Sequence, residues 1–292
     1  MRKDELIIVT GVKGQLGFDC VRTLTERGYT NVLGIDIEDL DITNEEAVNE
    51  FICSRKPSVV MHNAAWTAVD KADEFKEKVH QVNVLGPRYI AQACKKVGAK
   101  MFYISTDYVF EGKGEKPFEV DDPKVGLSTY GISKSEGEEE VKKNTDKYFI
   151  LRTSWVFGVN GNNYIKTMLR LAETKTELNI VCDQIGSPTY TLDLSRLMAD
   201  MMESEKYGTY HVTNEGFTSW YEFTKFIYEV AGITSVEVKP ITTENYLKLV
   251  PAQAIRPLNS RLSKKSLDEA GFKRLPTWQD ATTRYIKEEL KR

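Results

Sequence analysis

A tyrosine and a lysine four residues apart are the side chains best suited to proton transfer. Tyr130 and Lys134 lie in STYGISKSEGEEEV, whose composition predicts a helix, and this spacing places both side chains on one helix face. A phenol has a reference pKa of about 10, but an adjacent ammonium favours the phenolate and lowers that pKa. The pair therefore predicts a phenol that donates or accepts a proton. Taken alone, such a pair is also common on protein surfaces.

Polar residues at the end of an apolar run could hold the reacting group. The run KMFYIST predicts a strand that ends in Ser105 and Thr106 and is followed by Asp107. Open α/β sheets bind their ligands at the carboxyl ends of the strands. The Thr106 hydroxyl could therefore hold a carbonyl oxygen beside the phenol.

A glycine-rich turn, TGVKGQLG, connects the apolar run LIIV to the helical stretch DCVRTLTERG. Gly11 allows a tight turn, Gly14 the approach of a diphosphate, and Gly17 close packing of the helix on the strand. The helix N-terminus attracts the anion. The spacing is GxxGxxG rather than GxGxxG, so an ordinary glycine-rich turn remains an alternative.

Later strand ends favour a dinucleotide. Asp36 ends the run NVLGID about 20 residues after the loop, where an acid can bind the adenosine ribose, although a turn residue is also possible there. Asp41 and Ile42 could contact the adenine, although this stretch with Glu46 also suits a helix cap. The small residues of NAA, 63–65, would let a cofactor lie over the sheet edge.

The order of these elements predicts the fold class. Short β-branched runs alternate with helical stretches through the first half, in LIIVTG, NVLGID, SVVMHNAA, KMFYIST and YFILRTSWVFG. Such alternation is typical of a Rossmann-type, doubly wound parallel sheet of the α/β class. We expect residues 1–157 to form the dinucleotide-binding domain. Residues 158–292 would form mainly a smaller C-terminal α/β substrate-binding domain that returns at least one strand, TYHVT, to the main sheet.

Composition excludes several other classes of protein. The 292 residues carry a formal net charge of -3, with charges of both signs interspersed, so we expect no nucleic-acid or membrane-surface partner. The N-terminus resembles neither a signal peptide nor a membrane span, so a cytoplasmic location is expected. The EGEEE run suggests a solvated helix face. Neither metal nor disulfide spacing occurs among Cys20, Cys53, Cys94, Cys182, His62, His80 and His211.

The motifs TGVKGQLG, NAA, STDYVF and YGISK together resemble the extended short-chain dehydrogenase/reductase superfamily. Within it, the runs AAWTAVDKAD, VNVLGPRYIA, RTSWVFG, DQIGSPTY and RPLNSRL resemble the dTDP-4-dehydrorhamnose reductase family along the whole chain. The resemblance implies a monomer or homodimer that uses NADPH or NADH to reduce the C4 keto group of a dTDP-sugar, in surface-polysaccharide biosynthesis.

The resemblance also implies roles for individual residues. Tyr130 would donate the proton, Lys134 would assist it and hold the nicotinamide ribose, and Thr106 would contact the sugar carbonyl. Asp107, beside Thr106, would bind the substrate by accepting a hydrogen bond from a sugar hydroxyl, and Trp155 would pack on the sugar ring. The implied cofactor contacts, besides Tyr130 and Lys134, are Gly11, Gly14, Gln15, Leu16, Gly17, Asp36, Asp41, Ile42, Ala64, Ala65, Trp66 and Asn83.

Three implied features are less direct. Asn83 matches the superfamily asparagine that supports a water path from the lysine, or is a satisfied polar residue in its helix. Arg256 could bind the diphosphate, or be a surface arginine. Family members that dimerise through a metal use acidic residues near the glycine loop and the C-terminus. Here Asp19 resembles the first position, but the other positions read YTLDL and EELKR, so no metal is expected.

Cofactor choice and reaction type leave alternatives open. Asp36 should repel a 2′-phosphate, whereas Lys13 could pair with it. A dehydratase or epimerase of the same superfamily is a second possibility, but dehydratases need a glutamate where Tyr108 follows Asp107. A third is a noncatalytic relative, because the chain also resembles the regulatory subunit of methionine adenosyltransferase.

Overall fold

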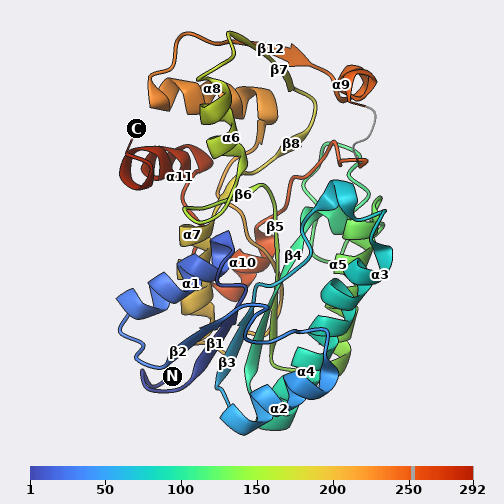
Figure 1. The fold of residues 1–292 in the computed structure, drawn as a ribbon, viewed down its shortest axis with the longest axis vertical. Helices are drawn as coiled ribbons and strands as arrows, with labels where there is room; N and C mark the ends of the chain where they lie inside the picture. The colour runs from blue at the N-terminus through green and yellow to red at the C-terminus, as the bar shows by residue number, and fades with distance from the viewer. Residues whose placement is uncertain (251–253, 292) are drawn as a thin grey trace.

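A computed structural model describes residues 1–250 and 254–291. Its centre is a six-stranded sheet in the order β10-β5-β4-β3-β1-β2 (Figure 1), and all of the neighbouring strands are parallel. The strands are β1 Ile7–Thr10, β2 Val32–Ile35, β3 Val59–His62, β4 Lys100–Thr106, β5 Tyr148–Thr153 and β10 Gly208–His211. The predicted α/β class with a doubly wound parallel sheet is confirmed.

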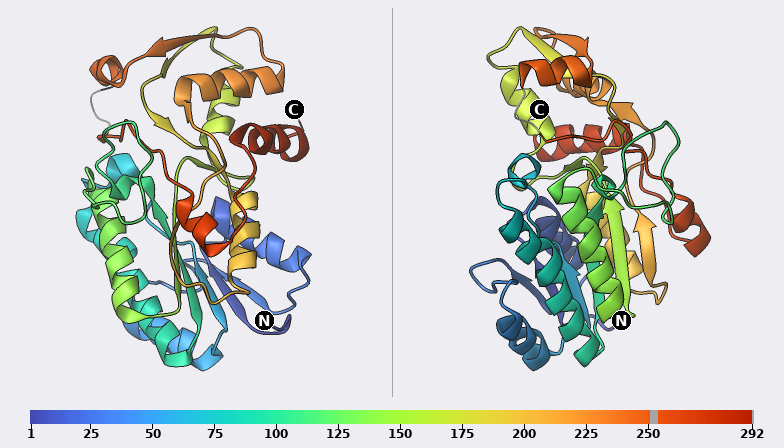
Figure 2. Two further views of the ribbon diagram at one scale, coloured as in Figure 1. Left: turned by 180° about the vertical axis from the view of Figure 1, so that it is seen from behind. Right: turned by 90° about the vertical axis from the view of Figure 1, so that its right-hand side faces the viewer.

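Helices cover both faces of this sheet (Figures 1 and 2). The helices on one face share a core with β1, β3 and β5; they are α1 Gln15–Glu26, α7 Thr191–Met201 and α10 Lys265–Ala270. The helices on the other face share a second core; they are α2 Glu45–Arg55, α4 Gly86–Val97 and α5 Thr129–Asn144. Because both faces are covered, strands such as β1 and β3 are buried along their whole length.

A second group of elements packs above the carboxyl ends of the strands, in the upper part of Figure 1. Its core is rich in aromatic side chains. Its helices are α6 Tyr164–Leu171, α8 Trp220–Ala231, α9 Thr243–Leu249 and α11 Trp278–Arg284. Its short strands are β6 Val156–Phe157, β7 Glu177–Val181, β8 Ile185–Gly186, β9 Thr189–Tyr190, β11 Thr218–Ser219 and β12 Glu237–Ile241.

The C-terminal half of the chain contributes to both groups. The strand β10 pairs with β5, α7 packs against α1, and α10 packs against β10. A boundary at residues 157 and 158 thus stays our proposal for the two domains. Among the residues that the structure describes, no helix is long and apolar enough to cross a membrane.

One predicted strand is divided in the structure. The run YFILRTSWVFG was expected to be a single strand, but β5 ends at Thr153 and β6 begins at Val156. Between them, Trp155 has a φ of 50°, in the left-handed region. A bulky residue there cannot continue a strand, so the chain turns at Trp155 and leaves the sheet.

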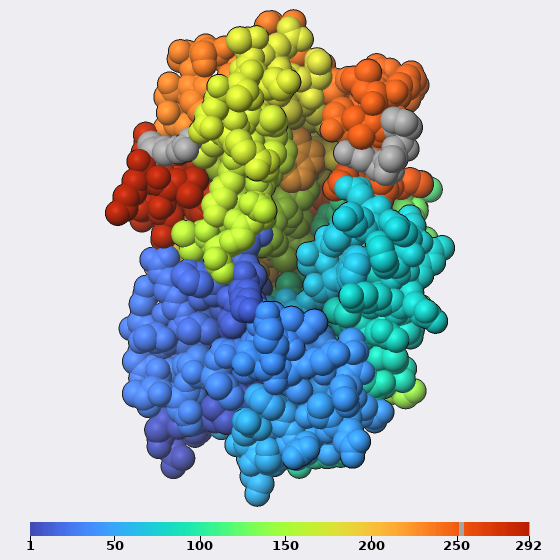
Figure 3. Space-filling model, in the orientation of Figure 1, coloured from blue at the N-terminus to red at the C-terminus, as the bar shows by residue number. Residues whose placement is uncertain are grey.

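The strand order changes direction between β1 and β3, because the chain runs outward to β2 on one side and to β4 and β5 on the other. Ligands bind outside the carboxyl ends of strands at such a point. Figure 3 shows a hollow at this level, between the yellow-green and the cyan segments and above the blue N-terminal part.

Candidate active site

The glycine loop forms the floor of the site at the end of β1. Gly11 has a φ of 69°, and a Cβ atom there would lie 2.9 Å from the Ala64 amide nitrogen. A Cβ atom on Gly17 would overlap the Gly11 carbonyl oxygen. Gly14 is the N-cap of α1, and no side chain of residues 1–250 or 254–291 caps this helix end. The free amides of the helix end are suited to bind a diphosphate. The tight loop and the small NAA residues beside it leave the room that this ligand needs.

Asp36 and Lys13 lie together at the rim of the loop. The Asp36 carboxylate accepts hydrogen bonds of 2.9 Å from the amides of Lys13 and Ile37. The Lys13 ammonium lies 2.6 Å from the Glu38 carboxylate. Asp36, the acid expected at the ribose, therefore also holds the glycine loop against the end of β2. The Lys13 side chain already has Glu38 as an acidic partner.

Three of the expected cofactor contacts have side chains engaged elsewhere. Leu16 and Ile42 are buried in the cores on the two sheet faces. The Asp41 carboxylate accepts hydrogen bonds from the amide and hydroxyl of Thr43, whereas the N-cap of α2 is Asn44. Direct adenine contacts by Asp41 and Ile42 stay predictions, and the Ile42 side chain is committed to the core.

Gln15 connects the glycine loop to the second group of elements. Its Oε1 accepts hydrogen bonds from the Gly158 amide at 2.7 Å and from Asn163 Nδ2 at 3.0 Å. Asn160 Nδ2 also donates to the Lys13 carbonyl at 2.9 Å. Asn160 and Asn163 could not be identified from local sequence patterns, because their partners lie about 150 residues away. These contacts fix the loop of 158–163 over the N-terminus of α1.

Asn83 holds the segment after NAA in place. It lies in a π-helical turn, Gln81–Leu85, and such turns frequently mark functional sites. Its side chain accepts from the Trp66 amide at 2.8 Å and donates to the Trp66 carbonyl and Ser133 Oγ, both at 3.1 Å. Asn83 therefore fastens Ala65 and Trp66 to α5. Its role in a water path stays a prediction.

Tyr130 and Lys134 lie in the first turns of α5, directly after its N-cap Ser128. The Lys134 side chain is 2% exposed, and its Nζ lies 4.0 Å from the ring centroid of Tyr103. Burial lowers the pKa of Lys134 to about 7, against the opposing effect of Glu138. The lysine therefore changes its charge near neutral pH.

The expected effect of Lys134 on the tyrosine is wrong for this structure. The pKa of Tyr130 is raised above its ordinary value rather than lowered. Burial is the largest cause and the Asp107 carboxylate adds to it, while a hydrogen bond with Thr106 opposes the shift. Desolvation of the phenolate therefore decides the direction of the shift. A protonated phenol is the form that a proton donor needs.

Thr106 and Asp107 lie beside Tyr130 at the end of β4. Thr106 Oγ1 donates to Asp107 Oδ1 at 3.0 Å and accepts from the Tyr108 amide at 3.2 Å. Among the residues that the structure describes, no group lies in hydrogen-bonding geometry with the buried Asp107 Oδ2 atom. Burial raises the pKa of this carboxyl to about 6, against the opposing effects of the Ser260 and Thr106 hydroxyls. A buried polar atom without a partner is rare in folded proteins. An incoming hydroxyl group would satisfy this oxygen.

Trp155 lies at the border of the two groups of elements. Its ring stacks on Trp220 at a centroid separation of 3.6 Å and an interplanar angle of 13°. Gly186 leaves room for it, since a Cβ atom there would lie 2.8 Å from Trp155 Cε2. The Trp220 indole in turn donates to Gln184 Oε1 at 3.2 Å. The expected sugar-binding aromatic is thus part of a stack, and its partner Trp220 was not predicted from the sequence.

Arg256 lies at the same site, next to Tyr108. Its guanidinium binds both carboxylate oxygens of Asp70, at 3.1 and 2.9 Å, and donates to the Tyr108 hydroxyl at 3.4 Å. The Tyr108 ring meets Tyr130 edge-on at 5.6 Å. One side chain, that of Tyr108, therefore separates Arg256 from the proposed proton donor Tyr130. The role of Arg256 as a diphosphate ligand stays a prediction. Asp70 is the partner that the sequence did not indicate.

The EGEEE run is not wholly solvated, as we had expected. Glu136 and Glu139 are exposed, but Glu138 is 0% exposed and binds Arg152. The reason is that Glu138 follows Lys134 by one helical turn and shares its inward face. His62 and His211 are buried, and burial lowers the pKa of each imidazole to about 3, so both are neutral.

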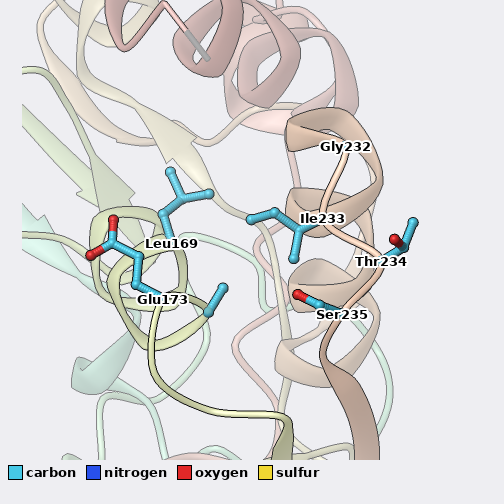
Figure 4. Close-up of a pocket in the computed structure, with 7 residues that line it drawn as sticks. Leu169, Glu173, Gly232, Ile233, Thr234 and Ser235 are labelled. Carbon is cyan, nitrogen blue, oxygen red and sulfur yellow. The ribbon is translucent and has the colours of Figure 1, made fainter.

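Other features lie away from this site. Asp19 is buried and accepts a hydrogen bond from Thr191. Within residues 1–250 and 254–291, three or more potential ligand side chains nowhere gather as a metal site would require. A surface pocket between the ends of α6 and α8 is lined by Leu169, Ala172, Glu173, Gly232, Ile233, Thr234 and Ser235 (Figure 4). None of the predicted site residues lines it.

Comparison with known proteins agrees with the geometry. Residues 5–291 match the family model described as RmlD substrate binding domain. The spore coat polysaccharide biosynthesis protein SpsK of Bacillus subtilis is 40% identical, over 97% of each chain. A dTDP-4-dehydrorhamnose reductase of Aggregatibacter actinomycetemcomitans is 39% identical, over 94% of this chain and 96% of that protein.

Solved structures extend the agreement. The dTDP-4-dehydrorhamnose reductase of Bacillus anthracis in complex with NADP has a TM-score of 0.93 at 39% identity, covering 98% of this chain and 99% of that one. The reductase of Clostridium acetobutylicum has a TM-score of 0.91 at 41% identity, covering 96% and 98% of the two chains. The resemblance seen in the sequence is confirmed. The chain belongs to the RmlD family, that of the dTDP-4-dehydrorhamnose reductases.

Proposed function

We propose that this protein uses NADPH or NADH to reduce the C4 keto group of dTDP-4-dehydro-L-rhamnose, which gives dTDP-L-rhamnose. The observation that carries the proposal is the packing of Tyr130 on Tyr108, whose amide donates to the Thr106 hydroxyl, at the sheet edge that also carries the glycine loop. The names of the relatives support the substrate and the cofactor. The reaction belongs to nucleotide-sugar and surface-polysaccharide biosynthesis. The free cysteines favour the cytoplasm, and a monomer or homodimer remains the proposed assembly.

The residues of the chain divide the work between binding and proton transfer. The glycine loop and the N-terminus of α1 would hold the diphosphate, Asp36 the adenosine ribose, and Lys134 the nicotinamide ribose. The bound nicotinamide supplies the hydride. Thr106 would orient the sugar carbonyl, and Tyr130 would give its proton to the oxygen as negative charge develops there.

We expect both NADPH and NADH to work, with kcat/KM values within about tenfold of each other, because Asp36 and Lys13 act in opposite directions. The Lys13 ammonium is shared with Glu38. Glu38→Gln should therefore favour NADPH, by up to about fivefold, which is the size of an exposed ion pair. Glu177→Gln, which breaks the exposed pair with Lys239, is the control and should change neither value. A strongly one-sided ratio in the unmodified protein would contradict this interpretation.

We expect Trp155→Ala to raise the KM for the sugar nucleotide while kcat stays within a few-fold. The half-buried stack on Trp220 should make its loss cost about 1 kcal/mol of folding stability. Trp278→Ala is the comparison, because Trp278 lies in the buried aromatic core and its loss should cost about 3–5 kcal/mol. Thermal unfolding and steady-state kinetics separate the two effects. Equal destabilisation of both variants, with no change in KM, would assign Trp155 to the core.

The chain should reduce its substrate without eliminating water. Elimination across C5 and C6 needs an acid and a base in addition to the tyrosine. Here Asp107 is followed by Tyr108, whose side chain packs on Tyr130 and binds Arg256, so one carboxylate follows Thr106 where a dehydratase needs two. We expect one reduced cofactor to be consumed per product formed, and no reaction with dTDP-glucose.

The same assay separates the competing functions. A 4-keto-6-deoxy product formed from dTDP-glucose, without net cofactor oxidation, would restore the dehydratase. A noncatalytic relative would bind NADPH and oxidise none with any 4-keto sugar nucleotide. Either result would overturn the proposed reductase.

A further inference from the structure

A buried ion pair lies directly behind the proposed catalytic residues. Glu138 is 0% exposed and Arg152 is 1% exposed. Arg152 Nε donates to Glu138 Oε1 and Arg152 Nη2 to Glu138 Oε2, each at 2.8 Å. Ser105 Oγ donates to the same carboxylate at 2.6 Å, and Lys124 Nζ lies 3.2 Å from it. Every lone-pair region of this carboxylate is therefore supplied with a donor.

These partners join the elements that carry the chemistry. Glu138 comes from α5, Ser105 from β4 and Arg152 from β5. Ser105 precedes Thr106, and Glu138 lies one and two turns after Lys134 and Tyr130 on the same helix. Arg152 is held in turn, because its Nη1 donates to the Val120 carbonyl at 2.8 Å. One carboxylate thus sets the position of α5 against the ends of both strands.

The same carboxylate is the negative charge that Lys134 senses inside the protein. At a spacing of four residues on a helix, the two side chains are neighbours. From the packed elements, Lys134 otherwise meets the phenol ring of Tyr103 and faces the neutral imidazole of His62. Tyr130 lies one turn before it on the same helix. The cations Arg152 and Lys124 are bonded to Glu138. Removing the Glu138 charge would leave Arg152 and Lys134 without this counter-ion, whereas Lys124 would keep its pair with Glu139 at 2.5 Å.

We propose that Glu138, fixed by Arg152 and Ser105, is a positioning residue that aligns α5 with Thr106 and keeps Lys134 in its ammonium form. This inference rests on the proposed function, since it assigns a supporting role in the same reaction. Burying an ion pair usually gives little net stability, because desolvation offsets the attraction. A pair placed behind the reactive side chains is better explained by the geometry and charge that it imposes on them.

The test measures kcat, KM and the pH profile of kcat/KM for Glu138→Gln. We expect kcat to fall about tenfold with KM for the sugar nucleotide nearly unchanged, because misplaced reacting groups affect the transition state. The decline in kcat/KM on the alkaline side should move about one pH unit lower, since Lys134 loses a nearby negative charge. Glu138→Asp keeps the charge on a side chain that is shorter by one methylene group. It should therefore lower kcat without moving the alkaline decline of kcat/KM.

A matched control exists on the same helix. Glu140 also forms a two-pronged pair with an arginine, Arg88, at 2.6 and 2.9 Å, but this pair lies between α5 and α4. Glu140→Gln should leave kcat and the pH profile unchanged. If the two glutamine variants behave alike, or if only thermal stability responds to Glu138→Gln, the positioning role is wrong.

A double variant covers the case in which the single one does not fold. Glu138→Gln with Arg152→Gln removes the buried guanidinium together with its carboxylate, so it should recover stability relative to the single variant. The proposal expects kcat to remain low in the double variant; recovery of wild-type kcat and pH profile would show a purely structural role.

NADPH binding, measured by tryptophan fluorescence against pH, gives a readout without turnover. The decline of NADPH affinity with rising pH should move to lower pH in Glu138→Gln, as the decline of kcat/KM does. If the unmodified protein binds NADPH but reduces no sugar nucleotide, the proposed function fails, while this binding shift still decides the role of Glu138.

Discussion

Tyr130→Phe should lower kcat by about 10³-fold, within the range ascribed to a positioned general acid. The substitution removes one hydroxyl from a side chain that lies against Thr106 and Tyr108. Because burial keeps the phenol protonated in the free protein, its proton is available at neutral pH. The phenylalanine of the variant has no proton to give to the sugar oxygen. NADPH affinity should change little, since the ring itself stays in place.

Tyr148→Phe is the control for this result. Tyr148 lies at the amino end of β5, at the opposite end of the sheet from the site, so its hydroxyl should be dispensable for turnover. Steady-state kinetics and NADPH titration of both variants provide the comparison. A Tyr130→Phe variant with near-normal kcat would remove the proton donor from the proposed mechanism.

Lys134→Gln should lower kcat/KM by about 10²-fold and weaken NADPH binding. Lys134 is buried under the site, and its pKa is lowered to about 7 by desolvation. Its ammonium is therefore present below pH 7 and is lost as the pH rises, so kcat/KM of the unmodified protein should decline on the alkaline side of about pH 7. This decline should be absent in the variant, because glutamine does not titrate.

Lys143→Gln is the matched control, because Lys143 is an exposed residue near the end of the same helix. It should keep both the rate and the pH profile of the unmodified protein. A decline that persists unchanged in Lys134→Gln would mean that another group titrates, and Lys134 would then have only a packing role.

The parts of the site that the sequence predicted are those with local signals. Glycine spacing after an apolar run located the loop at the end of β1, and the end of KMFYIST located Thr106. Both depend only on residues near one another in the chain, where backbone conformation and periodicity are expressed. The spacing of Tyr130 and Lys134 predicted one shared helix, α5, for the same reason.

The parts that it missed depend on distant partners. Glu138 looked like one of several solvated acids, and only the packing of β5 against α5 brings Arg152 to it. The conformation of Trp155 depends on stacking against Trp220. The raised pKa of Tyr130 could not be predicted either, because desolvation is set by the whole fold.

The most direct test of the central claim follows the hydride itself. The protein would be incubated with dTDP-4-dehydro-L-rhamnose and NADPH carrying deuterium at both C4 positions, and the product examined by mass spectrometry and NMR. The account predicts dTDP-L-rhamnose with one deuterium at sugar C4 and one NADP⁺ formed per product. A product without deuterium at C4, or deuterium at another sugar carbon, would contradict reduction of the C4 keto group.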